Sequence, residues 1–142
     1  MSDKATINGG CLCGKIQFTA TPADTTVGAC HCGMCRKWGG GPLMTVDCGT
    51  AVRFQESEHI SIYHSSEWAE RGFCAHCGSH LFYRLKESGQ YFIPAGLFDI
   101  CDNFIFDHQV FIDRKPSYYN FAEKTNNMTE AEIFAMYAPK SE

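Results

Sequence analysis

Three cysteines fall within the six-residue segment 30–35, which reads Cys-His-Cys-Gly-Met-Cys. In an extended segment, side chains two positions apart point to the same face, so Cys30 and Cys32 should lie together. One tight turn later, Cys35 can reach the same point. Three thiols this close would repel one another as anions or would oxidise, unless a soft cation holds them. Because zinc prefers such ligands, the motif predicts a zinc site with three protein ligands and an open fourth position.

Four more cysteines form two shorter motifs. Cys11 and Cys13 make a C-x-C motif between glycines, whereas Cys74 and Cys77 make a C-x-x-C motif followed by a glycine, as in zinc knuckles. Four thiolates around one ion form a closed, structural site. The simplest division therefore joins these four cysteines in one site and leaves the three at 30–35 in a second. Spacing alone also allows the middle cluster to share ligands with the others.

Composition limits the class of protein. The chain has 142 residues, of which 44% are hydrophobic and 13% aromatic, so we expect residues 1–142 to form a single globular domain. The net charge of −4, without a run of basic residues, argues against a nucleic-acid partner. No apolar run approaches the roughly 20 residues that a membrane span needs. Residues 1–6 lack the apolar core of a secretion signal, so we expect a cytoplasmic protein. Nine cysteines in that compartment favour metal binding over disulfides, and the odd number excludes complete pairing.

Short alternating segments predict a mainly β fold. We expect strands at 15–20, 26–29, 43–48, 51–54, 59–64, 68–73, 81–85, 90–96 and 104–112. Residues 36–42 are expected to be a loop, because the segment is rich in glycine. Pro94 predicts that its strand is irregular or lies at an edge. A capping box of Thr129 and Glu132 predicts one C-terminal helix, with its apolar side at Ile133, Met136 and Tyr137.

The three cysteine motifs, in this order, resemble those of the glutathione-dependent formaldehyde-activating (Gfa) family. The matching segments are Gly9-Gly10-Cys11-x-Cys13-Gly14, Cys30-His31-Cys32-x-x-Cys35-Arg36-Lys37 and Phe73-Cys74-x-x-Cys77-Gly78-Ser79. The resemblance extends over residues 9–120 and includes the segment 108–119. It implies an Mss4-like fold (a β-tent of twisted antiparallel sheets), with a structural zinc on Cys11, Cys13, Cys74 and Cys77. It also implies a second, functional zinc on Cys30, Cys32 and Cys35.

The family's named reaction adds glutathione to formaldehyde and gives S-hydroxymethylglutathione, a carbon–sulfur lyase reaction. The resemblance therefore implies an enzyme that joins a small thiol to formaldehyde or a related aldehyde at the open zinc, with the oligomeric state left open. The alternative is a non-enzymatic, zinc-stabilised binding or chaperone-like module. The open three-cysteine site argues against it, because a pure scaffold needs only closed sites.

Other chemically active side chains have simpler interpretations. His31 alternates with its two cysteine neighbours, so we expect it to point away from their metal and to pack or form hydrogen bonds. His76 is expected in an exposed loop, and a structural role is the default for the remaining histidines, although one of them could transfer protons near the open zinc. Cys48 is expected to be a small buried hydrophobe. Acidic neighbours of Cys101 argue against a reactive thiolate. The segment 36–38 is either a solvated rim or a contact surface for a glutathione-like ligand.

Overall fold

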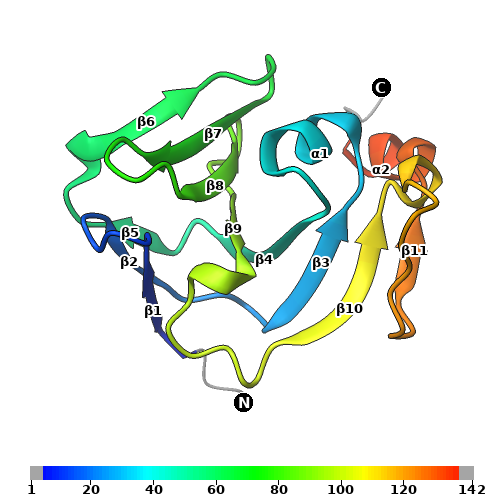
Figure 1. The fold of residues 1–142 in the computed structure, drawn as a ribbon, viewed down its shortest axis with the longest axis horizontal. Helices are drawn as coiled ribbons and strands as arrows, with labels where there is room; N and C mark the ends of the chain where they lie inside the picture. Colours follow the sequence, from blue (N-terminus) through cyan, green and yellow to red (C-terminus); the bar gives the residue numbers. More distant parts are fainter. Residues whose placement is uncertain (1–4, 138–142) are drawn as a thin grey trace. The chain divides into compact units, whose positions relative to one another are not determined.

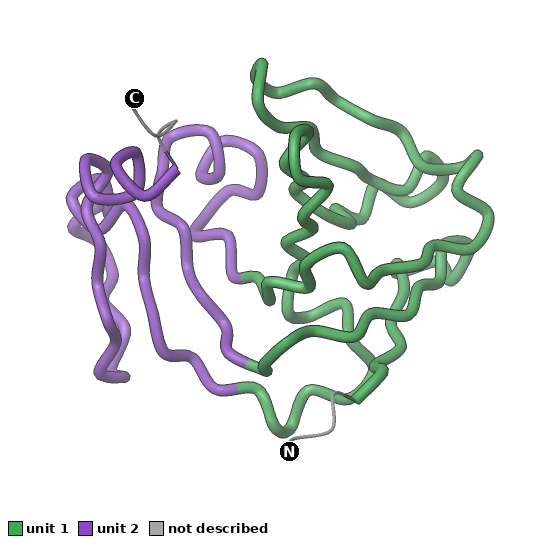
Figure 2. Tube along the Cα trace, turned by 180° about the vertical axis from the view of Figure 1, so that it is seen from behind, with its two compact units in different colours: residues 1–25, 45–104 green, residues 26–44, 105–142 purple. Residues whose placement is uncertain are grey.

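The computed structural model describes residues 5–137, which belong to two compact units (Figures 1 and 2). Unit 1 comprises the residues up to 25 and the segment 45–104, whereas unit 2 comprises 26–44 and the residues from 105 onward. Each unit is thus assembled from stretches that are distant in the sequence. The expectation of one domain over residues 1–142 stays a prediction. Of the segment 1–6, in which no secretion signal was expected, residues 1–4 lie outside the described residues.

Unit 1 contains two antiparallel arrangements of strands. Three strands pair in the order β1-β2-β5, and five pair in the order β4-β9-β8-β7-β6, where β4 belongs to this unit from Thr45 onward. Their bounds are Ile7–Gly10 (β1), Gln17–Ala20 (β2), Leu43–Gly49 (β4), Val52–Phe54 (β5), Ile60–Tyr63 (β6), Ala69–Cys74 (β7), His80–Leu85 (β8) and Tyr91–Pro94 (β9). Short 3-10 turns at Ser57–His59 (η1) and Ala95–Leu97 (η2) connect them.

Aromatic rings fill the core of unit 1. Phe18 lies edge-on to Phe98, with ring centroids 5.3 Å apart, and Phe54 packs at 5.3 Å from Phe82. Ile16 and Leu81 of the same unit are also completely buried. Each such side chain contributes about 1.5–3 kcal/mol by leaving water. This core fixes the two segments that carry Cys11 and Cys74, because both segments adjoin it.

Unit 2 pairs its strands in parallel, in the order β11-β10-β3. These strands are Thr26–Cys30 (β3), Ile105–Val110 (β10) and Asn126–Met128 (β11). Two α-helices, Gly33–Gly39 (α1) and Glu130–Tyr137 (α2), and a 3-10 turn at Ile112–Arg114 (η3) complete the unit. In the register of β3 and β10, Ala29 lies opposite Gln109 and Cys30 lies opposite Val110.

The predicted mainly β fold with a short C-terminal helix is confirmed. Strands close to all the expected ranges are present, and the capping box forms as predicted. The Thr129 N–H donates to Glu132 Oε1 at 2.8 Å, and the Glu132 N–H donates to Thr129 Oγ1 at 3.2 Å. The apolar side of the helix was predicted less well, because Met136 and Tyr137 are more than half exposed. The antiparallel pairing expected for the sheets holds in unit 1 and gives way to parallel pairing in unit 2.

One local prediction was wrong, and a second was confirmed in part. Residues 36–39 are helical, not a loop, because the glycines stand at the ends of α1 where they do little harm. The Cys32 sulfur caps the first turn by accepting from the Cys35 N–H at 3.3 Å, and Gly40 ends the helix with φ 83°. Pro94 predicted a strand that is irregular or lies at an edge, and the irregular alternative holds, because the pairing of β9 with β4 shifts register between Asp47 and Gly49. Since β9 lies between β4 and β8, Pro94 does not mark an edge strand. It is instead the last residue of β9, where a missing N–H matters least.

None of the helices within residues 5–137 has the length and apolar character that crossing a membrane requires.

Candidate metal centres

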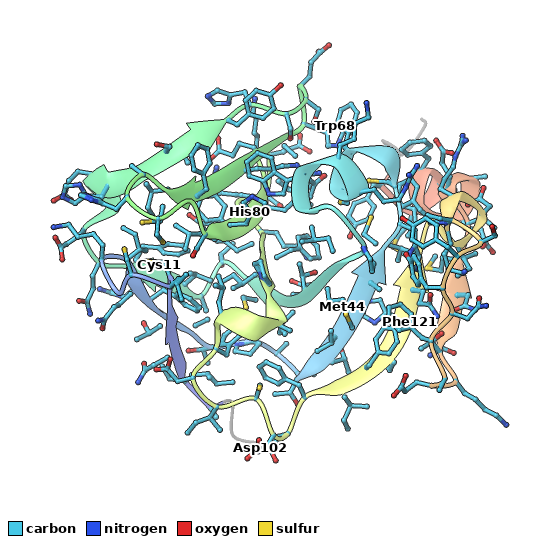
Figure 3. All side chains as sticks on the ribbon, in the orientation of Figure 1. Cys11, Met44, Trp68, His80, Asp102 and Phe121 are labelled. Atoms are coloured by element: carbon cyan, nitrogen blue, oxygen red, sulfur yellow. The ribbon has the colours of Figure 1, made fainter. Side chains whose placement is uncertain are left out.

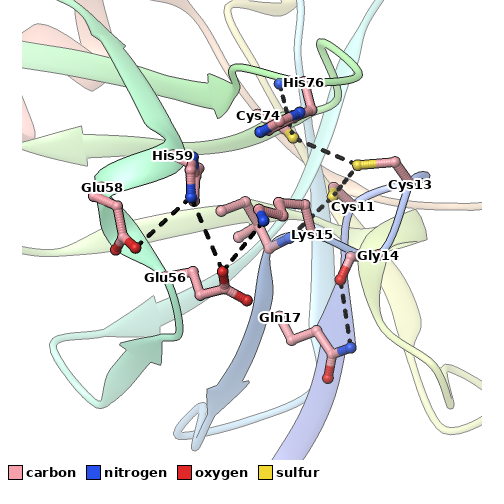
Figure 4. Close-up of polar contacts among 11 residues, drawn as sticks. Cys11, Cys13, Gly14, Lys15, Gln17, Glu56, Glu58, His59, Cys74 and His76 are labelled. Carbon is pink, nitrogen blue, oxygen red and sulfur yellow. Dashed lines mark hydrogen bonds and ion pairs between the residues drawn. The ribbon is translucent and has the colours of Figure 1, made fainter.

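Four cysteine sulfurs gather in unit 1, all within 4.8 Å of one another. Cys11 (labelled in Figure 3) and Cys13 lie in the turn after β1, whereas Cys74 and Cys77 lie at the end of β7 and in the turn that follows it. The Sγ atoms of Cys11 and Cys13 are 3.6 Å apart, and those of Cys13 and Cys74 are 3.8 Å apart (Figure 4). A tetrahedral ion with metal–sulfur bonds of about 2.3 Å separates its ligands by about 3.8 Å. The spacing therefore fits a tetrahedral metal and is far too long for disulfides.

Backbone N–H groups point at these sulfurs. Ile16 N–H donates to Cys11 Sγ at 3.3 Å, and the N–H groups of His76 and Cys77 both donate to Cys74 Sγ at 3.4 Å. Each turn includes a glycine in the left-handed conformation, Gly14 with φ 81° and Gly78 with φ 79°. Only a residue without a Cβ adopts this geometry easily, so the glycines allow the chain to fold around the sulfur.

Ser79 connects the two turns. Its hydroxyl accepts from the Leu12 N–H at 3.0 Å and lies 3.2 Å from Cys77 Sγ. The Ser79 hydroxyl and then its backbone N–H lower the pKa of Cys77 to about 5. At Cys13 the Lys15 backbone N–H lowers the pKa, but desolvation and the neighbouring thiols outweigh it and raise the net value to about 11. Burial raises the pKa of Cys11, but the Ile16 N–H and neighbouring thiols outweigh it and lower the net value. The cluster thus favours thiolates at Cys11 and Cys77 but opposes one at Cys13, so that four thiolates need a cation to balance their charge.

Three further sulfurs gather in unit 2, also within 4.8 Å of one another. Cys30 ends β3, Cys32 caps the N-terminus of α1, and Cys35 lies in the first turn of that helix. The neighbouring thiols of Cys32 and Cys35, together with burial, strongly raise the pKa of Cys30. Among the described residues this group has three members, all sulfur, and the set could hold a soft metal ion with one coordination position left for another ligand.

The structure therefore gathers the seven cysteines of the sequence motifs into two separate groups, one of four and one of three, as in the simplest division of the motifs. It also reveals a third group, Glu56, Glu58 and His59, that sequence reasoning missed. Figure 4 shows its contacts: His59 Nε2 lies 3.7 Å from Glu58, and Glu56 forms an ion pair with Lys15 at 3.5 Å. Because both carboxylates are exposed and one already has a cationic partner, we interpret this group as a surface ion-pair cluster.

The structure also locates the other side chains considered in the sequence. His31 is completely buried and hydrogen-bonded through both ring nitrogens, as expected. His76 is exposed, with its ring 5.1 Å from that of His59. Cys48 is 1% exposed, which confirms it as a small buried hydrophobe, whereas Cys101 is exposed. In the segment 36–38, Arg36 Nε donates to the His31 carbonyl at 3.2 Å.

Sequence reasoning missed the two side chains that hold the His31 ring, Tyr119 and Gln109. They are 88 and 78 residues from His31 in the chain. A tyrosine and a glutamine are common residues, and no spacing rule connects them to a histidine at that separation. Gln109 on β10 and Tyr119 in the segment after it come close to His31 only in the folded chain.

Comparison with known proteins agrees with this geometry. A family model described as glutathione-dependent formaldehyde-activating enzyme matches residues 6–114, a stretch that contains all seven clustered cysteines. An uncharacterized lyase of Schizosaccharomyces pombe is 40% identical over 126 residues, which cover 88% of this chain and 92% of that protein. A crystal structure of a Rhodobacter sphaeroides protein has the same fold, with a TM-score of 0.58 at 16% identity over 87% of this chain and 100% of that one.

Proposed function

Because this chain belongs to the glutathione-dependent formaldehyde-activating enzyme family, we propose that it is a zinc-dependent carbon–sulfur lyase. Its reaction would join a small thiol such as glutathione to formaldehyde or a related aldehyde, at the site formed by Cys30, Cys32 and Cys35. The observation that carries this proposal is the three-sulfur group itself, which offers three protein ligands where a closed site needs four. Clustered thiols persist in reducing compartments, which supports a cytoplasmic location.

Two zinc ions per chain fit the donor sets. All seven candidate ligands are sulfur, and zinc is the usual metal of such sites. The Cys11, Cys13, Cys74 and Cys77 group would be structural, because four thiolates leave no position for a substrate. At the other site, bound zinc would supply Lewis acidity and would stabilise a sulfur ligand in its thiolate form.

The chain's own residues prepare the second site for an anionic thiol. Cys35 is buried and Cys32 receives a backbone hydrogen bond, so the sulfurs are held in a fixed arrangement. The basic residues Arg36 and Lys37 follow on α1, and Lys37 is exposed. Two basic residues directly after Cys35 in the sequence support a ligand that carries carboxylates, as glutathione does, over a neutral thiol.

Nuclear magnetic resonance exchange spectroscopy tests the proposal directly. Zinc-loaded protein is added to an equilibrium mixture of glutathione, formaldehyde and their adduct, and the exchange rate is compared for wild type, Cys32→Ser and Cys101→Ser. We expect acceleration by wild type and by Cys101→Ser, whose exposed thiol lies outside both clusters, and none by Cys32→Ser. If wild type with two zinc ions bound leaves the exchange rate unchanged, the proposed reaction is wrong and binding without catalysis becomes the better interpretation.

A further inference from the structure

His31, the residue between two of the proposed metal ligands, has a completely buried ring with a partner at each nitrogen. Nδ1 lies 2.6 Å from the hydroxyl of Tyr119, and Nε2 lies 2.8 Å from Oε1 of Gln109. Phe121, labelled in Figure 3, packs near both rings, with centroid distances of 6.2 Å to His31 and 5.7 Å to Tyr119. Neither ring nitrogen is therefore available as a metal ligand.

The hydrogen bonds around this ring run in one direction. Thr125 donates its hydroxyl proton to Asn127 Oδ1 at 2.6 Å and accepts from Gln109 Nε2 at 2.9 Å. The Gln109 amide must then present its oxygen to His31, which makes Nε2 the protonated ring nitrogen and Nδ1 the acceptor. The Tyr119 hydroxyl consequently donates to Nδ1. A single tautomer satisfies the whole chain from Tyr119 to Asn127.

The backbone of His31 is anchored as well. Its N–H donates to the Val110 carbonyl at 3.2 Å, and its carbonyl accepts from Arg36 Nε at 3.2 Å. All four polar groups of the residue thus bind different partners. Because Cys30 and Cys32 flank it directly, the direction in which each thiol projects depends on the backbone angles of this one residue.

Tyr119 is itself held firmly. The Lys115 ammonium donates to the Tyr119 carbonyl and, at 2.9 Å, to that of Pro116, and it lies 4.9 Å over the Tyr119 ring.

We propose that His31 is a positioning residue for the three-cysteine site. The hydrogen-bond chain from Tyr119 to Asn127 orients its ring, its backbone anchors make Cys30 and Cys32 converge, and together they set how tightly the site holds its metal. The inference rests on the proposed function only in requiring that this site binds a metal. Outer partners of metal ligands typically change metal affinity by about 10–100-fold, and we expect an effect of this size here.

Cobalt(II) serves as the probe, because its absorption reports both binding and ligand geometry. Metal-free wild type, Tyr119→Phe and Gln109→Leu are titrated with cobalt(II) in competition with a chelator, and each site's affinity is measured separately. Tyr118→Phe is the matched control, since it removes a neighbouring hydroxyl from a side chain that is 76% exposed. The Cys11, Cys13, Cys74 and Cys77 group, which lies in the other unit, is an internal reference within every variant.

We expect Tyr119→Phe and Gln109→Leu to lower the affinity of the three-cysteine site about 10–100-fold and to change its cobalt(II) spectrum, with the four-cysteine site and Tyr118→Phe unaffected. Ring ¹⁵N shifts should show the Nε2-protonated tautomer of His31 in wild type. Unchanged affinity and spectrum in both variants would overturn the inference while leaving the proposed function intact. If the variants weaken the site but wild type catalyses no exchange, the inference stands and the proposed reaction fails. If wild type binds cobalt(II) at the four-cysteine site but not at the three-cysteine site, both the inference and the proposed function are wrong.

Discussion

Replacing Cys13 by serine should destabilise the protein more than replacing Cys32 by serine. Cys13 is exposed, so the substitution removes a metal ligand without disturbing the core. Its sulfur lies 3.8 Å from that of Cys74, 61 residues away in the chain. A cross-link over such a span restricts the unfolded chain by about 4 kcal/mol, whereas one over the short span from Cys30 to Cys35 contributes about 2 kcal/mol. We therefore expect Cys13→Ser to lose about 2 kcal/mol more in free energy of unfolding.

Urea unfolding at saturating zinc, followed by circular dichroism, measures the difference, and metal analysis verifies that each variant has lost one ion. Cys101→Ser is the control for removing an exposed thiol and should change stability by less than about 0.5 kcal/mol. A strong chelator should abolish the difference between the two variants, because it removes both cross-links. If Cys32→Ser lost as much stability as Cys13→Ser, the division into a structural and an open site would be wrong.

Single substitutions at Cys48, Gly28 and Thr129 test other parts of the structure. Burial, with a smaller contribution from Asp47, raises the pKa of Cys48 to about 12. Above about pH 9 the thiol ionises in the unfolded chain but not in the folded one, so the stability of the protein should fall as the pH rises. Over this pH range the urea midpoint should fall less for Cys48→Ala than for wild type. A Cβ on Gly28 would lie 2.0 Å from His108 Nε2, so Gly28→Ala should lower the free energy of unfolding by about 1–3 kcal/mol, as measured with urea. Gly41→Ala is the control and should lower it far less, because a Cβ there would have no atom within 4 Å. Thr129→Ala removes the helix cap, so it should lower the free energy of unfolding by about 1 kcal/mol and speed amide hydrogen exchange in α2. Unchanged exchange would show that this cap does not stabilise the helix.

Local patterns accounted for much of the fold and of the candidate site. The alternation of residues predicted nearly every strand, and the capping box predicted α2, because both depend on neighbours within a few positions. The glycine-rich segment after Cys35 misled the prediction, since a glycine weakens a helix in its interior and ends one favourably at its C-terminus. The effect of each glycine depended on where α1 begins. The helix begins after Cys32, whose sulfur caps its first turn, so the glycines stand at its ends.

The residues of the candidate metal sites could be identified from local sequence alone. The motif spacings bring two or three thiols to one point with little help from the rest of the chain, since steric rules for adjacent residues are enough. Tertiary structure decided which motifs share a site, that unit 2 pairs its strands in parallel, and that Tyr119 and Gln109 hold the ring of His31. These contacts join residues dozens of positions apart. Their free energy comes from burial and hydrogen bonding of the whole unit, and so no short stretch of sequence encodes them.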